Sequence, residues 1–403
     1  MRRLDATLLD ATLLAVTLGA SGCYLSHEPI ATLIDAAADG GTDAPIACIS
    51  DRECDDLEPC TIDSCVASRC AHDPIPLVPR GTFPTRSVWG SGSHAGEALV
   101  AESGSGTIRV RRFGADGDRG VLVEVEASGG RVWDTALAST GDDLAILTSE
   151  GSQIALRMAS RPDQVERAPG AMFVELVYTG RELVAISDNF DGCEIVWATR
   201  EGRFLEGTAR RSAACNHTQV LSSGHPSSHR SVRVSPGQVI LWSMDSDGRV
   251  DELSLAPDSA EAVSLVLSEP GPRFFHSLMA LEHEGRTGAL WVRTEDDARR
   301  EVHFGLVSRE GERLVPSMTQ ITQADDSPYV VRMSIAWCAG RFVAAHESES
   351  QVWVQQMDAG GRPIGEPLAL DDSVPSGGRR TIACFEGGAL VTTWSEAHVL
   401  GCE

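Results

Sequence analysis

The sequence predicts an all-β protein: a β-propeller of seven four-stranded blades, preceded by a small disulfide-rich module. Two recurring patterns predict the propeller. The first is a glycine turn followed by a short apolar strand, which occurs seven times at spacings of about 40 to 57 residues. The second is an acidic residue followed by glycine, a pair that favours two-residue hairpin turns. A third observation, five cysteines crowded between residues 48 and 70, predicts the module.

The two kinds of turn mark the repeat along the chain. The turns before an apolar strand begin at Gly96, Gly141, Gly180, Gly237, Gly288, Gly340 and Gly388. The acidic–glycine turns are Asp116-Gly117, Glu201-Gly202, Asp247-Gly248 and Glu310-Gly311, with Gly360-Gly361 as a degenerate copy. Each repeat is long enough for four strands of ordinary length.

The last two copies show how the ring is expected to close. The sixth copy predicts strands at 332–337, 342–347, 351–357 and 363–370. The seventh predicts strands at 381–385, 389–394 and 397–401 and lacks a fourth. Residues 82–88 are the candidate for that strand, since pairing the two chain ends removes an exposed edge. Cys402 would then be placed to close the ring covalently. Six blades are the alternative, if the irregular region 216–268 is not a blade.

Tryptophan occurs close to once per predicted blade. The eight are Trp89, Trp133, Trp197, Trp242, Trp291, Trp337, Trp353 and Trp394. One large flat side chain per unit suits packing between twisted sheets. A ring of carbohydrate-stacking platforms is the functional alternative. Recurrence in every repeat favours the core interpretation.

The N-terminus has the layout of a bacterial export signal. Arg2 and Arg3 precede an apolar run at 11–20, which ends on Ala20-Ser21-Gly22-Cys23. These four residues resemble a lipobox, which implies that Cys23 is lipidated and becomes the new N-terminus. Cleavage by an ordinary signal peptidase, and so plain secretion, is the alternative. The run is shorter than the ~20 residues of a membrane-spanning helix, so we expect membrane attachment by a lipid anchor only.

Four parts follow along the chain. A signal peptide is expected at 1–22 and a lipidated tether or linker, rich in Ala, Asp, Gly and Thr, at 23–47. The cysteine-rich module is expected at 48–79, with three prolines stiffening its end, and the propeller at 80–403. The expected location is the outer membrane or cell surface, or the medium if Cys23 is not acylated.

Cysteine usage supports export. Apart from Cys23, ten cysteines are disulfide candidates: Cys48, Cys54, Cys60, Cys65, Cys70, Cys193, Cys215, Cys338, Cys384 and Cys402. Disulfides persist in oxidising compartments. Because five of the ten lie in the module, at least one of those must pair outside it or stay free. The connectivity itself does not follow from the sequence.

The module has a recognisable motif. Cys54-Asp55-Asp56-Leu57-Glu58-Pro59-Cys60-Thr61-Ile62-Asp63-Ser64-Cys65, followed by Cys70-Ala71-His72, resembles the Dictyostelium-type extracellular cysteine repeat. The resemblance implies a disulfide-stabilised spacer or adhesion element without catalytic chemistry. Similar modules follow the signal peptides of exported bacterial proteins, especially in myxobacteria, and the whole chain resembles such a lipoprotein with a degenerate propeller. Zinc binding by these cysteines is the disfavoured alternative, because no paired C-x-x-C is present.

Charge excludes one class of partner. The formal net charge is −24 and all 34 basic residues are arginine. An anion of this size repels phosphate backbones, so we expect no nucleic-acid partner.

Four local features have both a functional and a structural interpretation. Cys215, His217, His225 and His229 lie in one polar stretch, where pairing of Cys215 with Cys193 is favoured over a metal site. Asp245, Asp247 and Asp251 resemble half of a calcium loop, and an acidic hairpin is favoured. His276, His283 and His303 are scattered and expected to be structural or tipped toward solvent. Gly90, Gly92 and Gly96 are expected in a hairpin loop, not in a phosphate-binding loop.

The sequence therefore predicts a cell-surface lipoprotein that acts as a non-enzymatic binding or scaffold module. The expected partner is a surface protein or a polysaccharide, and no catalytic residue, metal or cofactor is assigned. The alternative is an extracellular polymer-degrading hydrolase or lyase on a propeller scaffold. Only three tyrosines are present, which disfavours the lyase.

Overall fold

The computed structural model describes residues 48–402 with internal gaps. The gaps are 57–58, 105, 128–130, 171–172, 190–191, 213–229, 236, 245–248, 268–273, 296–298, 325–332, 349–350, 372–380 and 394. The predicted signal peptide and tether, with Cys23, lie outside the described residues. So do Cys215, His217, His225, His229, Asp245 and Asp247.

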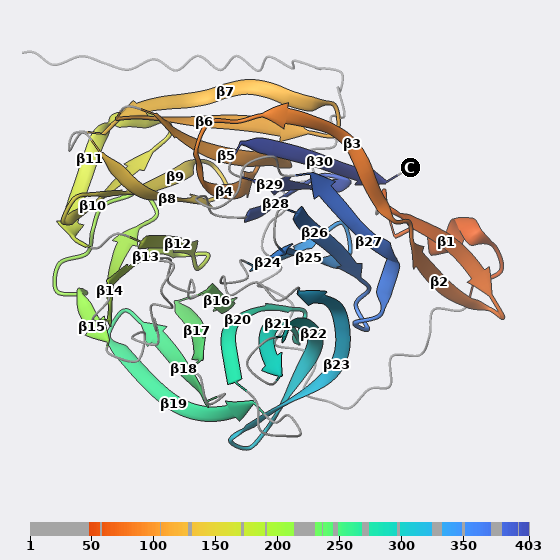
Figure 1. The fold of residues 1–403 in the computed structure, drawn as a ribbon. Helices are drawn as coiled ribbons and strands as arrows, with labels where there is room; N and C mark the ends of the chain where they lie inside the picture. Colours follow the sequence, from red (N-terminus) through yellow and green to blue (C-terminus); the bar gives the residue numbers. More distant parts are fainter. Residues whose placement is uncertain are drawn as a thin grey trace, which may run out of the picture.

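The described strands form seven four-stranded antiparallel blades around a central axis (Figure 1). The blades, each given from its innermost strand outward, are as follows. Blade 1 has β4 (Val88–His94), β5 (Glu97–Gly104), β6 (Thr107–Gly114) and β7 (Gly117–Glu126); blade 2 has β8 (Val132–Ser139), β9 (Leu144–Glu150), β10 (Gln153–Met158) and β11 (Arg161–Pro169). Blade 3 has β12 (Phe173–Tyr178), β13 (Glu182–Asn189), β14 (Gly192–Thr199) and β15 (Arg210–Ser212); blade 4 has β16 (Arg230–Ser235), β17 (Gln238–Met244), β18 (Arg249–Ala256) and β19 (Ser259–Leu267). Blade 5 has β20 (Phe274–His283), β21 (Arg286–Glu295), β22 (Arg299–Glu310) and β23 (Arg313–Ala324); blade 6 has β24 (Met333–Cys338), β25 (Arg341–Ser348), β26 (Gln351–Met357) and β27 (Pro363–Asp371). Blade 7 has β28 (Thr381–Phe385), β29 (Gly388–Thr392), β30 (Glu396–Cys402) and β3 (Leu77–Pro84).

The predicted fold class is confirmed, and the blade number is seven. The irregular region holds a complete blade, because β16 to β19 pair in order between residues 230 and 267. Its outer strand β19 also pairs in parallel with β23, which joins blades 4 and 5 into one eight-stranded sheet. The strands expected in the sixth and seventh copies match β24 to β30 to within two residues at each end.

The seventh blade is closed by the other end of the chain, as expected, but by an earlier segment. The closing strand β3 begins at Leu77 and not at Thr82, and Val88 already belongs to β4 of the next blade. Pro79 is tolerated because β3 is an outer edge strand, and the pairing with β30 is irregular between Pro79 and Gly81.

Turn chemistry explains the hairpins between first and second strands. In blades 1, 5 and 6 the turn is a two-residue pair in which both φ angles are positive, Ala95-Gly96, Glu284-Gly285 and Ala339-Gly340. This is the geometry of the tight hairpin turn whose twist matches that of the strands, and glycine adopts it without strain.

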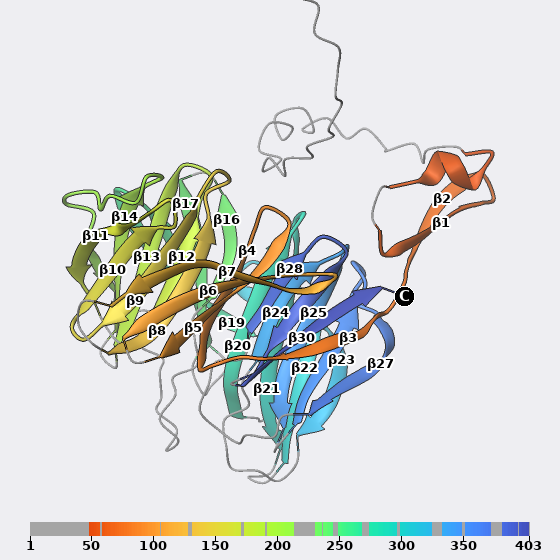
Figure 2. The ribbon, with the colours of Figure 1, turned by 90° about the horizontal axis from the view of Figure 1, so that it is seen from above.

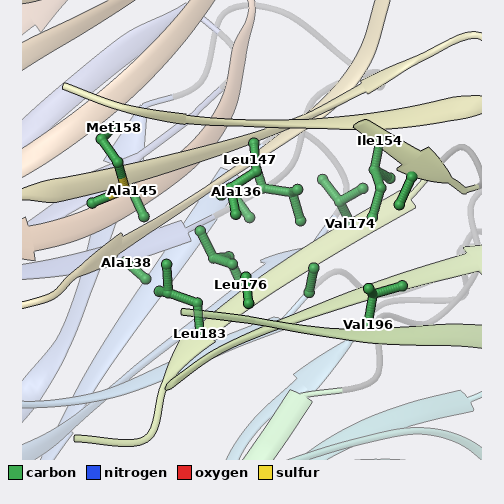
Figure 3. Close-up of a cluster of buried hydrophobic side chains, with 14 residues drawn as sticks. Ala136, Ala138, Ala145, Leu147, Ile154, Met158, Val174, Leu176, Leu183 and Val196 are labelled. Carbon is green, nitrogen blue, oxygen red and sulfur yellow. The ribbon is translucent and has the colours of Figure 1, made fainter. Parts of the chain in front are cut away.

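The core is divided among the interfaces between blades. The buried apolar side chains form seven clusters, one between each pair of neighbouring blades. The cluster between blades 2 and 3 (Figure 3) packs small residues such as Ala136 and Ala138 against Leu176 and Leu183. The short side chains let the two sheets approach closely, which is how radial sheets bury both faces.

Gly90 and Gly92 correct one prediction, because they lie in strand β4 and not in a hairpin loop. A Cβ on Gly90 would lie 2.2 Å from the carbonyl oxygen of Thr135, and one on Gly92 would lie 3.0 Å from Leu137 Cβ. The two glycines therefore allow the innermost strands of blades 1 and 2 to approach each other.

The cysteine module consists of a short 3₁₀ helix, η2 (Asp51–Cys54), and a hairpin of β1 (Thr61–Val66) and β2 (Arg69–Pro74). It lies at the edge of the ring beside blades 6 and 7 (Figure 2). Two disulfides are internal, Cys48–Cys65 and Cys54–Cys70. The third, Cys60–Cys402, joins the module to the last strand of the propeller. The module is thus anchored to the propeller and is not a detached spacer.

Buried polar side chains strengthen this attachment. Arg341 donates hydrogen bonds to the carbonyl oxygens of Cys60, at 2.7 Å, and of Ile75. The Gln356 side-chain amide makes two 2.8 Å bonds, one to the N–H and one to the carbonyl of Leu77. These contacts fix the connector between module and propeller to blade 6.

The disulfides are consistent with an extracellular protein. No helix in the described part of the chain has the length and apolar character needed to cross a membrane.

Candidate binding site at the rim of the propeller

The innermost strands of the seven blades end together on one face of the ring, next to the turns that lead to the second strands. We call these ends the turn-side rim. Four half-buried side chains with ring systems stand at or next to a strand end there: His94, Tyr178, His283 and Trp337. They come from four different blades, so the closure of the ring is what gathers them.

The most developed part of the rim is a stacked pair. The rings of His283 and Trp337 lie 4.2 Å apart at an interplanar angle of 18°, and Phe342 meets the Trp337 ring edge-on at 4.7 Å. Partial burial lowers the pKa of His283, while Glu284 opposes this weakly. The imidazole is therefore neutral at neutral pH, and the pair offers a flat, uncharged and partly exposed surface.

Polar contacts tie the neighbouring strand ends together. His94 Nδ1 lies 2.8 Å from Ser139 Oγ, linking blades 1 and 2. The Cys384 N–H donates to Ser93 Oγ at 2.9 Å, linking blades 7 and 1. A disulfide between Cys338 and Cys384 links blades 6 and 7. The rim is thus held in one shape before any ligand arrives, which reduces the ordering cost of binding.

The surrounding turns are acidic. They carry Asp142, Asp143, Glu182, Glu284 and Glu386 next to the strand ends. Together with the net charge of −24, they disfavour a polyanionic ligand.

Apart from the rim, a hollow lies between the outer parts of blades 2 and 3. It has a volume of about 420 Å³ and is lined by residues that include Met158, Arg161, Glu166, Glu201 and Arg203. Arg161 donates to the Glu201 carbonyl oxygen at 2.9 Å across the hollow. The hollow is open to solvent and is lined by both arginine and glutamate side chains. It therefore indicates no particular class of ligand.

The residues that the sequence singles out as candidate sites lie in different surroundings. Cys193 is disulfide-bonded, while its expected partner Cys215 lies outside the described residues. His217, His225, His229, Asp245 and Asp247 also lie outside the described residues. Asp251 lies in β18. His303 is buried, 3.0 Å from Glu301 and stacked on Trp291, which fits a structural role. Among the tryptophans, Trp197, Trp242 and Trp291 are buried in the core, whereas Trp337 is half-buried at the rim.

The rim as a set was missed by the sequence analysis. His283 was expected to be structural or tipped toward solvent, and Trp337 to pack in the core with carbohydrate stacking as the alternative, but the sequence did not predict that the two would meet. The signal that could have joined them is their position: each stands within two residues of a glycine turn that opens a second strand. Tyr178 and His94 share that position.

No known protein family matches the chain, and no curated protein matches it. One similar solved structure is the Cps50 (Swd1) β-propeller domain of Myceliophteria thermophila, with 12% identity, a TM-score of 0.48, and coverage of 81% of this chain and 100% of that one. Another is the Nup133 β-propeller domain of Vanderwaltozyma polyspora, with 9% identity, a TM-score of 0.49, and coverage of 78% and 93%. The described sheets themselves define this chain as a closed, disulfide-linked β-propeller.

Proposed function

We propose that this protein is an exported, non-enzymatic binding module, held at the cell surface through acylated Cys23, that binds a neutral polysaccharide at the turn-side rim. The observation that carries the proposal is the stacked pair of His283 and Trp337, partly exposed and uncharged in neutral solution. Flat aromatic surfaces bury ligand area at little entropic cost, and the polar tips beside them fix orientation.

Two further features support this proposal over one with a charged ligand. Ser93, His94 and Ser139 supply hydroxyl and imidazole groups elsewhere on the rim, in blades 1 and 2, and such groups suit the hydroxyl groups of a sugar. The acidic turns disfavour acidic polymers by repulsion. A rigid scaffold that carries its recognition groups at strand ends is the usual arrangement in binding folds.

The test is isothermal titration of the full chain with neutral gluco-, galacto- and manno-oligosaccharides. We expect saturable binding to at least one series, weakened at least tenfold by Trp337→Ala and by His283→Ala, since truncated aromatic anchors typically cost this much. Trp133→Ala is the matched control, because Trp133 is half-buried at the opposite end of an innermost strand. Absence of saturable binding to all three series, or equal affinity in the His283 and Trp337 variants, would refute the proposal.

The proposed lipid anchor at Cys23 is tested separately. Intact mass of the protein from membrane and soluble fractions should show a chain that begins at Cys23 and carries a diacylglycerol increment. A chain trimmed there without lipid would make the protein a secreted one.

A further inference from the structure

The cysteine module gathers three side chains with metal-ligand chemistry on one face. The ligating atoms of Asp56, Asp63 and His72 all lie within 4.8 Å of one another. His72 Nδ1 lies 2.7 Å from Asp63 Oδ1 and 3.3 Å from Asp56 Oδ2. We propose that these three side chains bind one first-row divalent cation, with Zn²⁺ as the ion that fits the donors best. This site is independent of the rim.

The ligands are positioned by constraints that do not depend on a metal. Asp63 and His72 are direct cross-strand partners in the β1–β2 hairpin, so their side chains leave the same face. The Cys54–Cys70 disulfide joins the backbone two residues before Asp56 to the backbone two residues before His72. This bond holds the third ligand beside the other two. A site preorganised in this way loses little conformational freedom when it binds an ion.

The separations are close to those of a tetrahedral site. Metal bonds of about 2.0–2.2 Å to nitrogen and oxygen place neighbouring ligand atoms roughly 3.3 Å apart. The Asp56–His72 separation already has this value, and the shorter Asp63–His72 separation would need to widen by about 0.6 Å. That change requires the Asp63 carboxylate, which is 16% exposed, to move relative to the His72 ring.

The donor set distinguishes among cations. One imidazole nitrogen with two carboxylates suits Zn²⁺ and its first-row neighbours, whereas Ca²⁺ takes roughly six to eight oxygen ligands. The side chains of His72, Asp56 and Asp63 are 40%, 27% and 16% exposed. Water can therefore reach the fourth position of a bound ion, and the two carboxylates balance its charge.

The test is equilibrium dialysis of the metal-stripped full chain against Zn²⁺, with bound metal counted by mass spectrometry. We expect about one ion per chain at this site, with micromolar affinity that falls at least tenfold in His72→Gln and in Asp63→Asn. Asp73→Asn is the matched control, because Asp73 lies on the same hairpin with its side chain on the opposite face, and it should bind as the natural chain does. Unchanged affinity in both ligand variants would overturn the proposal by placing the metal elsewhere.

A second measurement needs no variant and so is independent of folding defects. Diethyl pyrocarbonate modifies exposed imidazoles, and the modified peptide containing His72 can be quantified by mass spectrometry. We expect Zn²⁺ to reduce modification of His72 at least tenfold while His94 is unaffected. Equal modification of His72 with and without saturating Zn²⁺ would equally overturn the site. Neither result bears on oligosaccharide binding at the rim, so the two proposals fail separately.

Discussion

The junction of blades 6, 7 and 1 and the junction of blades 2 and 3 are held together in different ways. We call the first the closing seam. It carries the disulfides Cys60–Cys402 and Cys338–Cys384 and the polar contacts of Arg341. Blades 2 and 3 have no disulfide between them among their described residues, and they meet through a cluster of apolar side chains.

The difference follows from chain connectivity. Blades 2 and 3 are consecutive in sequence, so a short link already keeps them together, and ordinary packing is sufficient. At the closing seam β3 pairs with β30 from the opposite end of the chain. Bringing those ends together costs loop-closure entropy, which the cross-link removes from the unfolded state. The Cys60–Cys402 bond thus stands where the two ends of the chain meet, whereas Cys338–Cys384 reinforces two blades that are already consecutive in sequence.

The largest loss of stability should come from removing the Cys60–Cys402 disulfide of the closing seam. Cys60 and Cys402 are 342 residues apart, and in the chain-entropy description a loop of that size contributes about 6 kcal/mol. We therefore expect Cys60→Ala/Cys402→Ala to lower the urea midpoint strongly. Cys48→Ala/Cys65→Ala removes a disulfide within the module, with a separation of only 17 residues, and should leave the unfolding of the ring nearly unchanged. Equal losses in the two double variants would contradict the seam argument.

The sequence predicted the blades more accurately than the seam. Strand β26 of blade 6 alternates, and β25 follows a glycine turn, so period and turn chemistry located the strands of this blade closely. Strand β3 contains Pro79 and shows no clean alternation, and only its partner β30 makes it a strand. The prediction therefore placed it five residues late.

The sequence could not predict which side chains contact one another across blades, for a related reason. Nothing local to Arg341 or Gln356 indicates that they hold the connector at Ile75 and Leu77, because the contact exists only once the ring is closed. The pairing of His283 with Trp337 at the rim likewise depends on two blades meeting. Patterns within a strand are local, whereas these contacts are products of the closed topology.

The next largest loss of stability is expected at the junction of blades 1 and 2, where Arg157 of blade 2 donates a hydrogen bond to the Glu126 carbonyl oxygen of blade 1. Arg157 and Glu150 form an ion pair at 2.8 Å in blade 2, with both side chains 1% exposed. Removing one partner leaves a buried charge uncompensated, so Glu150→Gln should destabilise by about 4 kcal/mol. Glu150→Leu/Arg157→Met should cost much less, because no charge is then buried. Urea unfolding of the single and double variants tests this, and a double variant worse than the single one would contradict it.

A smaller effect is expected where blades 1 and 2 meet. Gly90→Ala would place a methyl group 2.2 Å from the Thr135 carbonyl oxygen, so the innermost strands must separate. Overpacking of this kind costs about 1–3 kcal/mol. Gly104→Ala is a suitable control, since a Cβ there meets nothing within 4 Å. Thermal unfolding should show a lower midpoint for the first variant only.

His346 in blade 6 should affect stability least at neutral pH. Its effect should increase as the pH falls. Its ring is fully buried, neither nitrogen has a hydrogen-bond partner among the described residues, and burial lowers its pKa to about 3. The unfolded chain binds a proton near the ordinary value of 6.5, whereas the folded chain does not. Stability from this residue is therefore fully present above pH 6.5 and is lost as the pH falls from 6.5 toward 3.

At pH 5 the loss from this residue should reach about 2 kcal/mol, since each pKa unit corresponds to about 1.4 kcal/mol. The measurement is urea unfolding at pH 7 and pH 5 for the natural chain and for His346→Leu, which cannot titrate. The difference between the two chains isolates His346 from every other group. His346 lies two residues from Ala344, on the face of β25 that packs against blade 5. Neither disulfide of the closing seam crosses that interface, so we expect acid to weaken the ring there while the seam remains closed. An equal loss in both chains would show that His346 is protonated in the folded state without cost.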